Sequence, residues 1–236
     1  SFDERDDLPR PNGVWPMGGA EAAEMAKLAE TTYRDVNIGL ANQFARYADV
    51  VGIDVARVIE ACNSQPYSHI HRPGIAVGGH CIPVYPRLYL AGDPDATVVS
   101  AARAANAAMP AYAVSRAASL LGSLSGLRVA VLGAAYRGGV KETAFSGVFG
   151  VVGALREAGA QVGVHDPLYS DEELAAFGWG AYHLGEAVDV AIIQADHAAY
   201  RDLTPADLPG VRLFVDGRAI TSPEAWSGTP RITIGG

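Results

Sequence analysis

The hydrophobic pattern of the chain changes its period about halfway along the sequence. From Ala20 to Val51, apolar residues recur at helical spacing with no proline and no glycine pair, which predicts one long helix. Asp54 can cap a second helix that runs to about Cys62. Residues 96–124 are rich in alanine and predict more helix, bent at Pro110 because proline lacks the backbone N–H group. The first half is therefore predicted to be helical.

From Gly126 onward, short apolar runs alternate with helical segments. Each of "LRVAVLG", "QVGVHD", "VDVAIIQAD" and "VRLFVDG" predicts a buried strand, "RITIGG" predicts an edge strand, and residues 146–158 predict a helix. Strands that alternate with helices form a parallel, doubly wound sheet, so the expected fold class is α/β. We divide the chain into an irregular leader (1–19), a central helical domain (20–126) and a C-terminal Rossmann-like domain (127–236).

The segment between the helical regions, residues 63–94, is rich in proline and glycine and is predicted to be a shaped loop. Its most informative part is residues 72–83, which contain Cys81. Glycine permits positive φ and close approach of the backbone, so that N–H groups can converge on an anionic ligand. The glycines expected to do so are Gly74, Gly78 and Gly79.

Two interpretations of Cys81 follow from the residues alone. It is a nucleophile if a cation such as Arg72 or Lys27, or the loop amides, stabilises its thiolate. It is inert packing if apolar side chains cover it, as for many free cysteines. Cys62 follows Ile59 on an apolar helical face and is expected to belong to the core.

Composition narrows the class of protein. Hydrophobic residues make up 49% and charged residues 19% of the 236 positions, enough for a sizeable core. The net charge of -8 argues against nucleic acid or an anionic membrane as partner. No apolar run approaches the ~20 residues of a membrane span, and two cysteines are too few for a disulfide framework. We expect a cytoplasmic protein without a metal site.

Two motifs together resemble one enzyme family. "AEAAEMAKLAETTYRDVNI" followed by "GIAVGGHCIP" is similar to the UDP-glucose/GDP-mannose dehydrogenase family, in particular its branch that oxidises UDP-N-acetylhexosamines. The resemblance covers about residues 14–220, the family's middle and C-terminal domains. It implies NAD-dependent oxidation of C6 of a UDP-sugar to the acid, through a thiohemiacetal and a thioester on Cys81. It also implies a homodimer built on residues 20–51, and an N-terminal NAD domain that these residues do not contain.

The resemblance also implies roles for several charged residues. Lys27 matches the lysine that stabilises negative charge on the sugar oxygen, and Thr31 and Arg34 follow it at i+4 and i+7, so that one helix face can present all three to a substrate. A solvated polar face is the alternative. Arg72 matches an arginine that reaches the neighbouring subunit's substrate, so its role requires a dimer. Lys141 matches a phosphate-binding position, although it could equally be a surface lysine.

Two positions depart from the family pattern. Thr31 stands where the family commonly has asparagine, and Tyr85 stands where it commonly has an aspartate close to the cysteine. Tyrosine is a poor base near pH 7. Either proton handling has moved elsewhere or the site is weakened. The second possibility leaves room for a non-catalytic module that binds nucleotide sugar or only dimerises.

The C-terminal sheet gives a weak dinucleotide signal. Its first turn carries Gly133, Gly138 and Gly139, which do not fit the Gly-x-Gly-x-x-Gly spacing. Asp166, at the end of the next strand, could imitate a ribose-binding acid, but an aspartate before proline more often starts a turn. Residues that bind the cofactor are therefore not identified.

Overall fold

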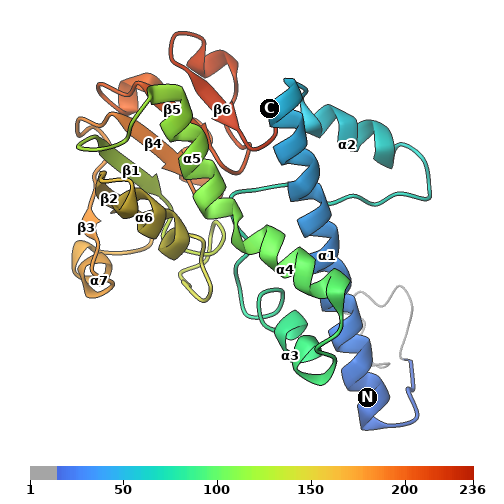
Figure 1. Cartoon of the computed structure of the whole chain (residues 1–236). Coiled ribbons are helices and arrows are strands. Elements are labelled where there is room, and N and C mark those ends of the chain that lie inside the picture. The colour runs from blue at the N-terminus through green and yellow to red at the C-terminus, as the bar shows by residue number, and fades with distance from the viewer. Residues whose placement is uncertain (1–14) are drawn as a thin grey trace, which may run out of the picture.

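The computed structural model describes residues 15–236, so most of the expected leader lies outside the described residues. The central region is helical (Figure 1), and the two predicted helices at its start are confirmed. Asp54 caps the second of them by accepting a hydrogen bond from the amide of Ala56 at 2.9 Å. The helices of this region are α1 (Ala20–Val51), α2 (Val55–Asn63), α3 (Tyr85–Gly92), α4 (Thr97–Ala107) and α5 (Met109–Leu121).

The C-terminal region is a six-stranded parallel sheet in the order β3-β2-β1-β4-β5-β6. This arrangement confirms the predicted α/β class. The strands are β1 (Arg128–Leu132), β2 (Gln161–His165), β3 (Gly180–Ala181), β4 (Val190–Ile193), β5 (Leu213–Asp216) and β6 (Arg231–Thr233). The connecting helices include α6 (Val148–Glu157) and α7 (Asp171–Ala176).

Burial on both faces explains why the central strands are continuous apolar runs. Every residue of β4 and of β5 is buried, as parallel strands covered on both sides require. One face packs on α5 and α6, and the other is closed by aromatic residues such as Trp226, which stacks on Phe214 with ring centroids 3.7 Å apart. The sheet therefore provides a rigid base for the segments that lie at its carboxyl edge.

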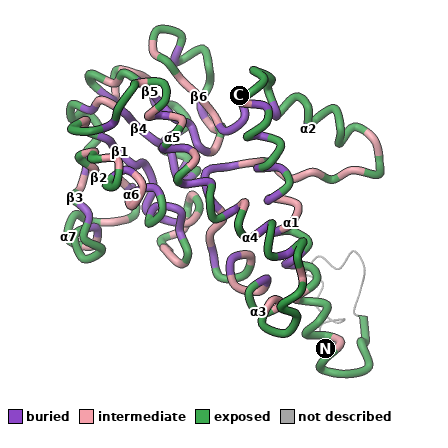
Figure 2. The backbone as a smooth tube through the Cα atoms, viewed as in Figure 1, coloured by how far each residue is buried: buried purple, intermediate pink, exposed green. Residues whose placement is uncertain are grey.

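The contact between α1 and α4 uses small and polar residues. The buried face of α1 includes Ala41, Ala45 and Ala48, and a Cβ atom on Gly39 would lie 3.2 Å from Ala102. Large apolar side chains of the predicted helical pattern, Leu40 among them, are instead exposed. The helix was correctly predicted, but its buried positions carry small residues and several of its large apolar side chains are exposed; along the helix, buried and exposed positions alternate (Figure 2).

Several expectations about the elements are corrected by the structure. Residues 63–94 contain helix α3, whose Pro86 lies in the first turn, where a missing N–H group is tolerated. The predicted helix 96–124 is two helices, α4 and α5, separated near Pro110. Cys62 was expected in the core but is exposed, because α2 buries only Val55 and Ile59. Within residues 15–236, no helix is both long enough and apolar enough to cross a membrane.

Candidate functional site

Cys81, the nucleophile expected from the sequence, lies immediately before α3. Its backbone carbonyl accepts hydrogen bonds from the amides of Val84 and Tyr85, at 3.1 and 2.9 Å, and so belongs to the turn that leads into the helix. Its thiol is free and the residue is exposed. A thiol in this position is open to a ligand, whereas a packing cysteine would be covered by apolar side chains.

The glycines before the cysteine let the loop lie against the C-terminal sheet domain. A Cβ atom on Gly78 would come within 2.7 Å of the Cβ atom of Tyr136. Gly79 has a φ of +92°, and its amide donates a hydrogen bond to the carbonyl of Ala144 at 2.9 Å. In the structure these glycines therefore make a close approach to a protein loop, and their contact with a substrate stays a prediction.

Asparagines of two helices hold the extended segment that leads to this loop. Asn37 of α1 donates from Nδ2 to the carbonyl of His69 at 2.7 Å and accepts from the amide of His71 at 2.8 Å. Asn63 at the end of α2 donates from Nδ2 to the carbonyl of Ile70 at 2.9 Å and accepts from the amide of Ile70 at 2.8 Å. No pattern in the sequence singles out these asparagines, because their partners become neighbours only in the folded chain.

A buried polar network connects α1 and α4 to the start of the glycine loop. Asp35 accepts two hydrogen bonds from Arg103, each 2.5 Å long. Asn106 joins Asp35 to Asn42, and Oδ1 of Asn42 accepts from the amide of Gly74 at 3.0 Å. The backbone at Gly74 is therefore fixed to the helical domain through side chains that are themselves fully paired.

Lys27 of α1 lies over the ring of Tyr85, with its Nζ 5.4 Å from the ring centroid. Because Tyr85 is in the first turn of α3, this contact brings the lysine to the end of α3 that follows the cysteine. Glu30 pairs with Lys27 at 3.2 Å and with Arg34 at 3.5 Å. Lys27 and Arg34 therefore share one carboxylate, that of Glu30, which no motif in the sequence singles out.

Thr31 lies in the interior of the chain, whereas Lys27 and Arg34 are exposed. Its Oγ1 is 2.9 Å from the carbonyl of Lys27 and 3.1 Å from Oε2 of Glu30. Slight burial alone would raise the pKa of Glu30. The hydrogen bonds from Lys27 and Thr31 outweigh this effect, so the pKa of Glu30 lies below its ordinary value. The three predicted residues therefore do not form one exposed stripe, and an ionised Glu30 connects them.

An open cavity of about 760 Å³ lies between α2, the segment before the glycine loop and the carboxyl ends of β5 and β6. Arg72 and Arg218 both line it, and neither has a carboxylate partner within residues 15–236. The guanidinium of Arg218 donates to the carbonyls of Gln194 and Ala76, at 2.6 and 3.2 Å. Burial lowers the pKa of Arg218 from its ordinary value. Asp54, Glu60 and Asp216 also line the cavity, but neither arginine forms an ion pair with them, and Cys81 does not line it.

Lys141 is occupied by contacts within its own domain. Its Nζ lies 2.5 and 2.7 Å from the two carboxylate oxygens of Glu173 and 5.2 Å from the ring centroid of Tyr169. Arg137 of the same loop lies over the ring of Tyr136, at 5.7 Å, and no carboxylate within the described residues pairs with it. Lys141 therefore has a carboxylate partner, whereas Arg137 has none within residues 15–236.

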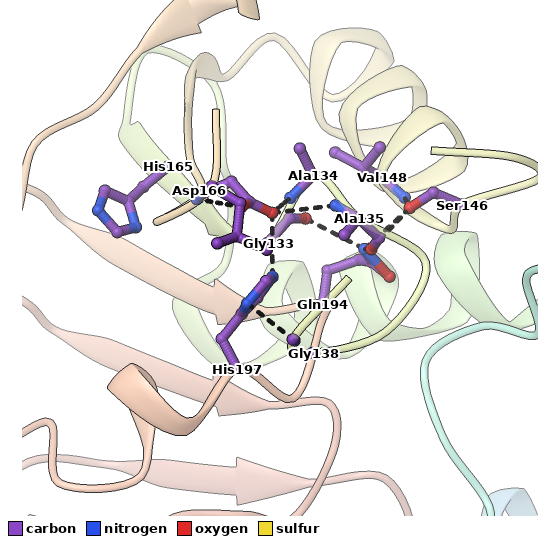
Figure 3. A network of polar contacts seen from close by, with 12 residues as sticks. Gly133, Ala134, Ala135, Gly138, Ser146, Val148, His165, Asp166, Gln194 and His197 are labelled. Atoms are coloured by element: carbon purple, nitrogen blue, oxygen red, sulfur yellow. Dashed lines mark hydrogen bonds and ion pairs between the residues drawn. The ribbon is translucent and has the colours of Figure 1, made fainter. Parts of the chain in front are cut away.

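Asp166 does not extend outward from the end of β2 as a ribose-binding acid would. Its carboxylate turns back onto the segment that follows β1 and accepts hydrogen bonds from the amides of Ala134 and Ala135 (Figure 3). Burial alone would raise the pKa of Asp166, but the hydrogen bonds from His197 and from backbone amides outweigh it and lower the pKa. The turn interpretation of this aspartate is therefore closer to the structure than the ribose interpretation.

Comparison with known proteins matches both regions of the chain. Residues 21–108 match the model of the central domain of the UDP-glucose/GDP-mannose dehydrogenase family, and residues 130–223 match the model of its UDP binding domain. The chain is 35% identical to the UDP-N-acetyl-D-mannosamine dehydrogenase of Methanocaldococcus jannaschii, over 88% of this chain and 49% of that protein.

Solved structures give the same result. The UDP-D-ManNAc dehydrogenase of Pyrococcus horikoshii superimposes with a TM-score of 0.80 at 33% identity, over 92% of this chain and 52% of that one. A UDP-glucose dehydrogenase from Pyrobaculum islandicum superimposes with a TM-score of 0.79 at 26% identity, over 91% of this chain and 51% of that one. The chain therefore spans about half the length of the relatives that it matches.

Proposed function

Because the chain belongs to the UDP-glucose/GDP-mannose dehydrogenase family, we propose that it is part of an NAD-dependent enzyme that oxidises C6 of a UDP-sugar to the acid. Relatives named UDP-N-acetyl-D-mannosamine dehydrogenase favour a UDP-N-acetylhexosamine as substrate. The observation that carries the proposal is the exposed thiol of Cys81 at the start of α3, with Lys27 over the first turn of the same helix.

Cys81 is assigned the covalent step of the reaction. Its thiolate adds to the aldehyde carbon at C6, a C–S bond forms, and the carbonyl electron pair moves to oxygen. The ammonium of Lys27 stabilises the oxyanion of this thiohemiacetal. At the thioester stage, water adds to the carbonyl carbon, the C–S bond breaks, and the acid and the free thiol are released. Thr31 is assigned a supporting role beside Lys27, to whose carbonyl its hydroxyl is bonded.

NAD is assigned to another part of the enzyme. The turn after β1 does not fit a dinucleotide, because the carboxylate of Asp166 already accepts the amides that a phosphate would need. The two oxidations, of the alcohol and of the thiohemiacetal, are therefore not assigned to residues of this chain.

Arginines are the strongest candidates for the phosphates of the substrate. Arg72 and Arg218 line one cavity without forming an ion pair with a carboxylate, and a guanidinium suits the bidentate geometry of phosphate.

Arg34 and Lys141 are weaker candidates for binding phosphate, since Glu30 and Glu173 already pair with them. The loop that carries Gly74, Gly78 and Gly79 completes the proposed substrate site through the close approach that its backbone allows; the amides of Gly74 and Gly79 already donate to Asn42 and Ala144. The proposal keeps residues 20–126 as the central domain and 127–236 as the UDP-sugar-binding domain.

A homodimer through α1 is part of the proposal. Large apolar side chains recur along the exposed face of this helix, which supports a contact with a second copy of the chain. We further propose a cytoplasmic location. Free thiols at Cys62 and Cys81 support it, because oxidising compartments favour disulfides.

The test uses the longer protein that contains this chain, with NAD and UDP-N-acetylhexosamines. Acid formation by Cys81→Ser should fall by about a thousandfold or more, because the alcohol is a far weaker nucleophile. Cys62→Ser, which changes the other exposed cysteine, should keep full activity. Undiminished acid formation by Cys81→Ser would refute the covalent role. Calorimetric binding of UDP-sugars without turnover in the unaltered protein would favour the non-catalytic module instead.

A further inference from the structure

The turn after β1 lies where a doubly wound sheet ordinarily binds a nucleotide. β1 is flanked by β2 and β4, so the connections on its two sides run in opposite directions at this point of the sheet. In such folds a ligand enters the crevice at the carboxyl ends of the strands, and amides of the first turn donate hydrogen bonds to its phosphates. The corresponding amides here belong to Ala134 and Ala135.

A carboxylate of the protein already accepts both of these amides (Figure 3). Oδ2 of Asp166 lies 2.8 Å from the nitrogen of Ala134, 3.0 Å from that of Ala135 and 3.1 Å from Nε2 of His197. Nδ1 of His197 accepts from the amide of Gly139 at 3.3 Å, which leaves the proton on Nε2. Three N–H donors therefore converge on one carboxylate oxygen in the interior of the domain.

The rest of the loop is also bound within the protein. The amide of Tyr136 donates to the carbonyl of Glu142 at 2.9 Å, and the amide of Gly138 donates to Oδ1 of Asp196 at 2.7 Å. Gln194 donates from Nε2 to the carbonyls of Gly133 and Ala135, at 3.1 and 2.9 Å. Helix α6 begins at Val148, and Ser146 just before it donates from Oγ to the carbonyl of Ala135 at 3.1 Å and accepts from the amide of Val148 at 3.3 Å, so the amide at the start of this helix is also bound within the protein.

We propose that Asp166 is a built-in anion that occupies the phosphate position of the C-terminal sheet and thereby excludes a dinucleotide from it. A carboxylate oxygen with three convergent donors satisfies the same groups as a phosphate oxygen and needs no ligand. The side chain of Asp166 is fully buried and that of His197 almost so, which prevents solvent from competing for these bonds. Ligands of this sheet are then held by side-chain cations at its edge, such as Arg218, and not by turn amides.

Chemical rescue tests this assignment in the chain as it stands. Asp166→Ala should leave a void faced by three unpaired N–H groups, which formate can fill. We expect formate to raise the melting temperature of Asp166→Ala by about 3–6 °C at tenfold above its dissociation constant, relative to chloride at equal ionic strength. The unaltered chain and Asp166→Asn, which keeps the void filled, should show no formate-specific rise. A folded Asp166→Ala variant with no such rise would contradict the proposal.

A second measurement does not require any variant to fold. In the ¹⁵N-labelled unaltered chain, titration with pyrophosphate or NAD should leave the amide resonances of Ala134 and Ala135 unshifted. Saturable shifts at these amides would overturn the proposal. Neither measurement depends on turnover or on Cys81, so the proposed enzymatic function could fail while this inference stands, or the reverse.

Discussion

Among single residues, Arg218 has an environment that a contribution to stability does not explain. It is partly buried and its guanidinium donates only to carbonyl oxygens, so its charge has lost solvation without forming an ion pair, and the carboxylate of Asp196 acts on it only through space. A function in binding an anion explains such an arrangement. We expect Arg218→Met to weaken UDP binding at least about tenfold, because the guanidinium contributes charge-assisted hydrogen bonds to phosphate. Isothermal titration calorimetry with UDP measures this change.

Arg201→Met provides the matched control, because it removes the same charge from an exposed position outside the cavity. Its affinity for UDP should equal that of the unaltered chain. Equal loss of affinity in both variants would mean that only the net charge matters. Unchanged affinity in Arg218→Met would contradict the assignment of the phosphates to this cavity.

Residue types with intrinsic chemistry could be selected from the sequence, but their partners could not. Cys81 was selected because a thiol after a glycine loop is chemically distinctive, and Lys27 was selected through the resemblance to the family. Glu30 was overlooked because a glutamate on an exposed helix is ordinary until its contacts with Lys27 and Arg34 are known. Arg218 could not be selected from the sequence, because it lines the cavity only once the chain has folded and the segment after β5 lies there.

Among the elements, the junction of the glycine loop with α6 depends on the absence of one side chain. A Cβ atom on Gly147, which caps α6, would lie 2.2 Å from the Cβ atom of Ala76 in the loop. The φ of Gly147 is -63°, so space and not backbone strain is the constraint. Gly147→Ala should therefore lower the free energy of unfolding by about 1–3 kcal/mol, the cost of overpacking a filled interface. Urea denaturation measures it.

Gly153→Ala is the comparison within the same helix, because no atom lies within 4 Å of a Cβ built there. Alanine favours helix, so this variant should be neutral or more stable by up to about 1 kcal/mol. Similar destabilisation by both substitutions would show that the contact between the loop and α6 is not the cause.

Elements with a long periodic pattern were predictable, whereas those defined by neighbours were not. The bounds of α1 follow from its uninterrupted pattern, and β4 and β5 follow from runs that both faces of the sheet bury. α3 was missed because residues 63–94 as a whole are rich in proline and glycine, although one of these prolines, Pro86, occupies a tolerated position in the first turn of the helix. β3 has two residues and exists only through its pairing with β2.

At the scale of the whole molecule, α1 carries an apolar face that residues 15–236 leave uncovered. The exposed side chains of this face recur at spacings of three, four and seven residues, which places them along one stripe of the helix. They are between 39% and 67% exposed: Tyr33, Leu40, Phe44, Tyr47 and Val51. The opposite face of α1 packs small residues against α4. A second copy of the chain would bury the stripe and remove this apolar area from water.

Two negative charges in the centre of this stripe should therefore separate the copies. We expect the unaltered chain to elute with twice its mass of 24.6 kDa in size-exclusion chromatography with light scattering, and the double variant Phe44→Glu, Tyr47→Glu to elute as a monomer. The free-energy cost of burying two unpaired carboxylates at an apolar contact exceeds the stabilisation that the contact provides. Leu120→Glu changes an exposed apolar residue of α5 outside the stripe and should remain dimeric. A monomeric unaltered chain, or a double variant that stays dimeric, would contradict the dimer through α1.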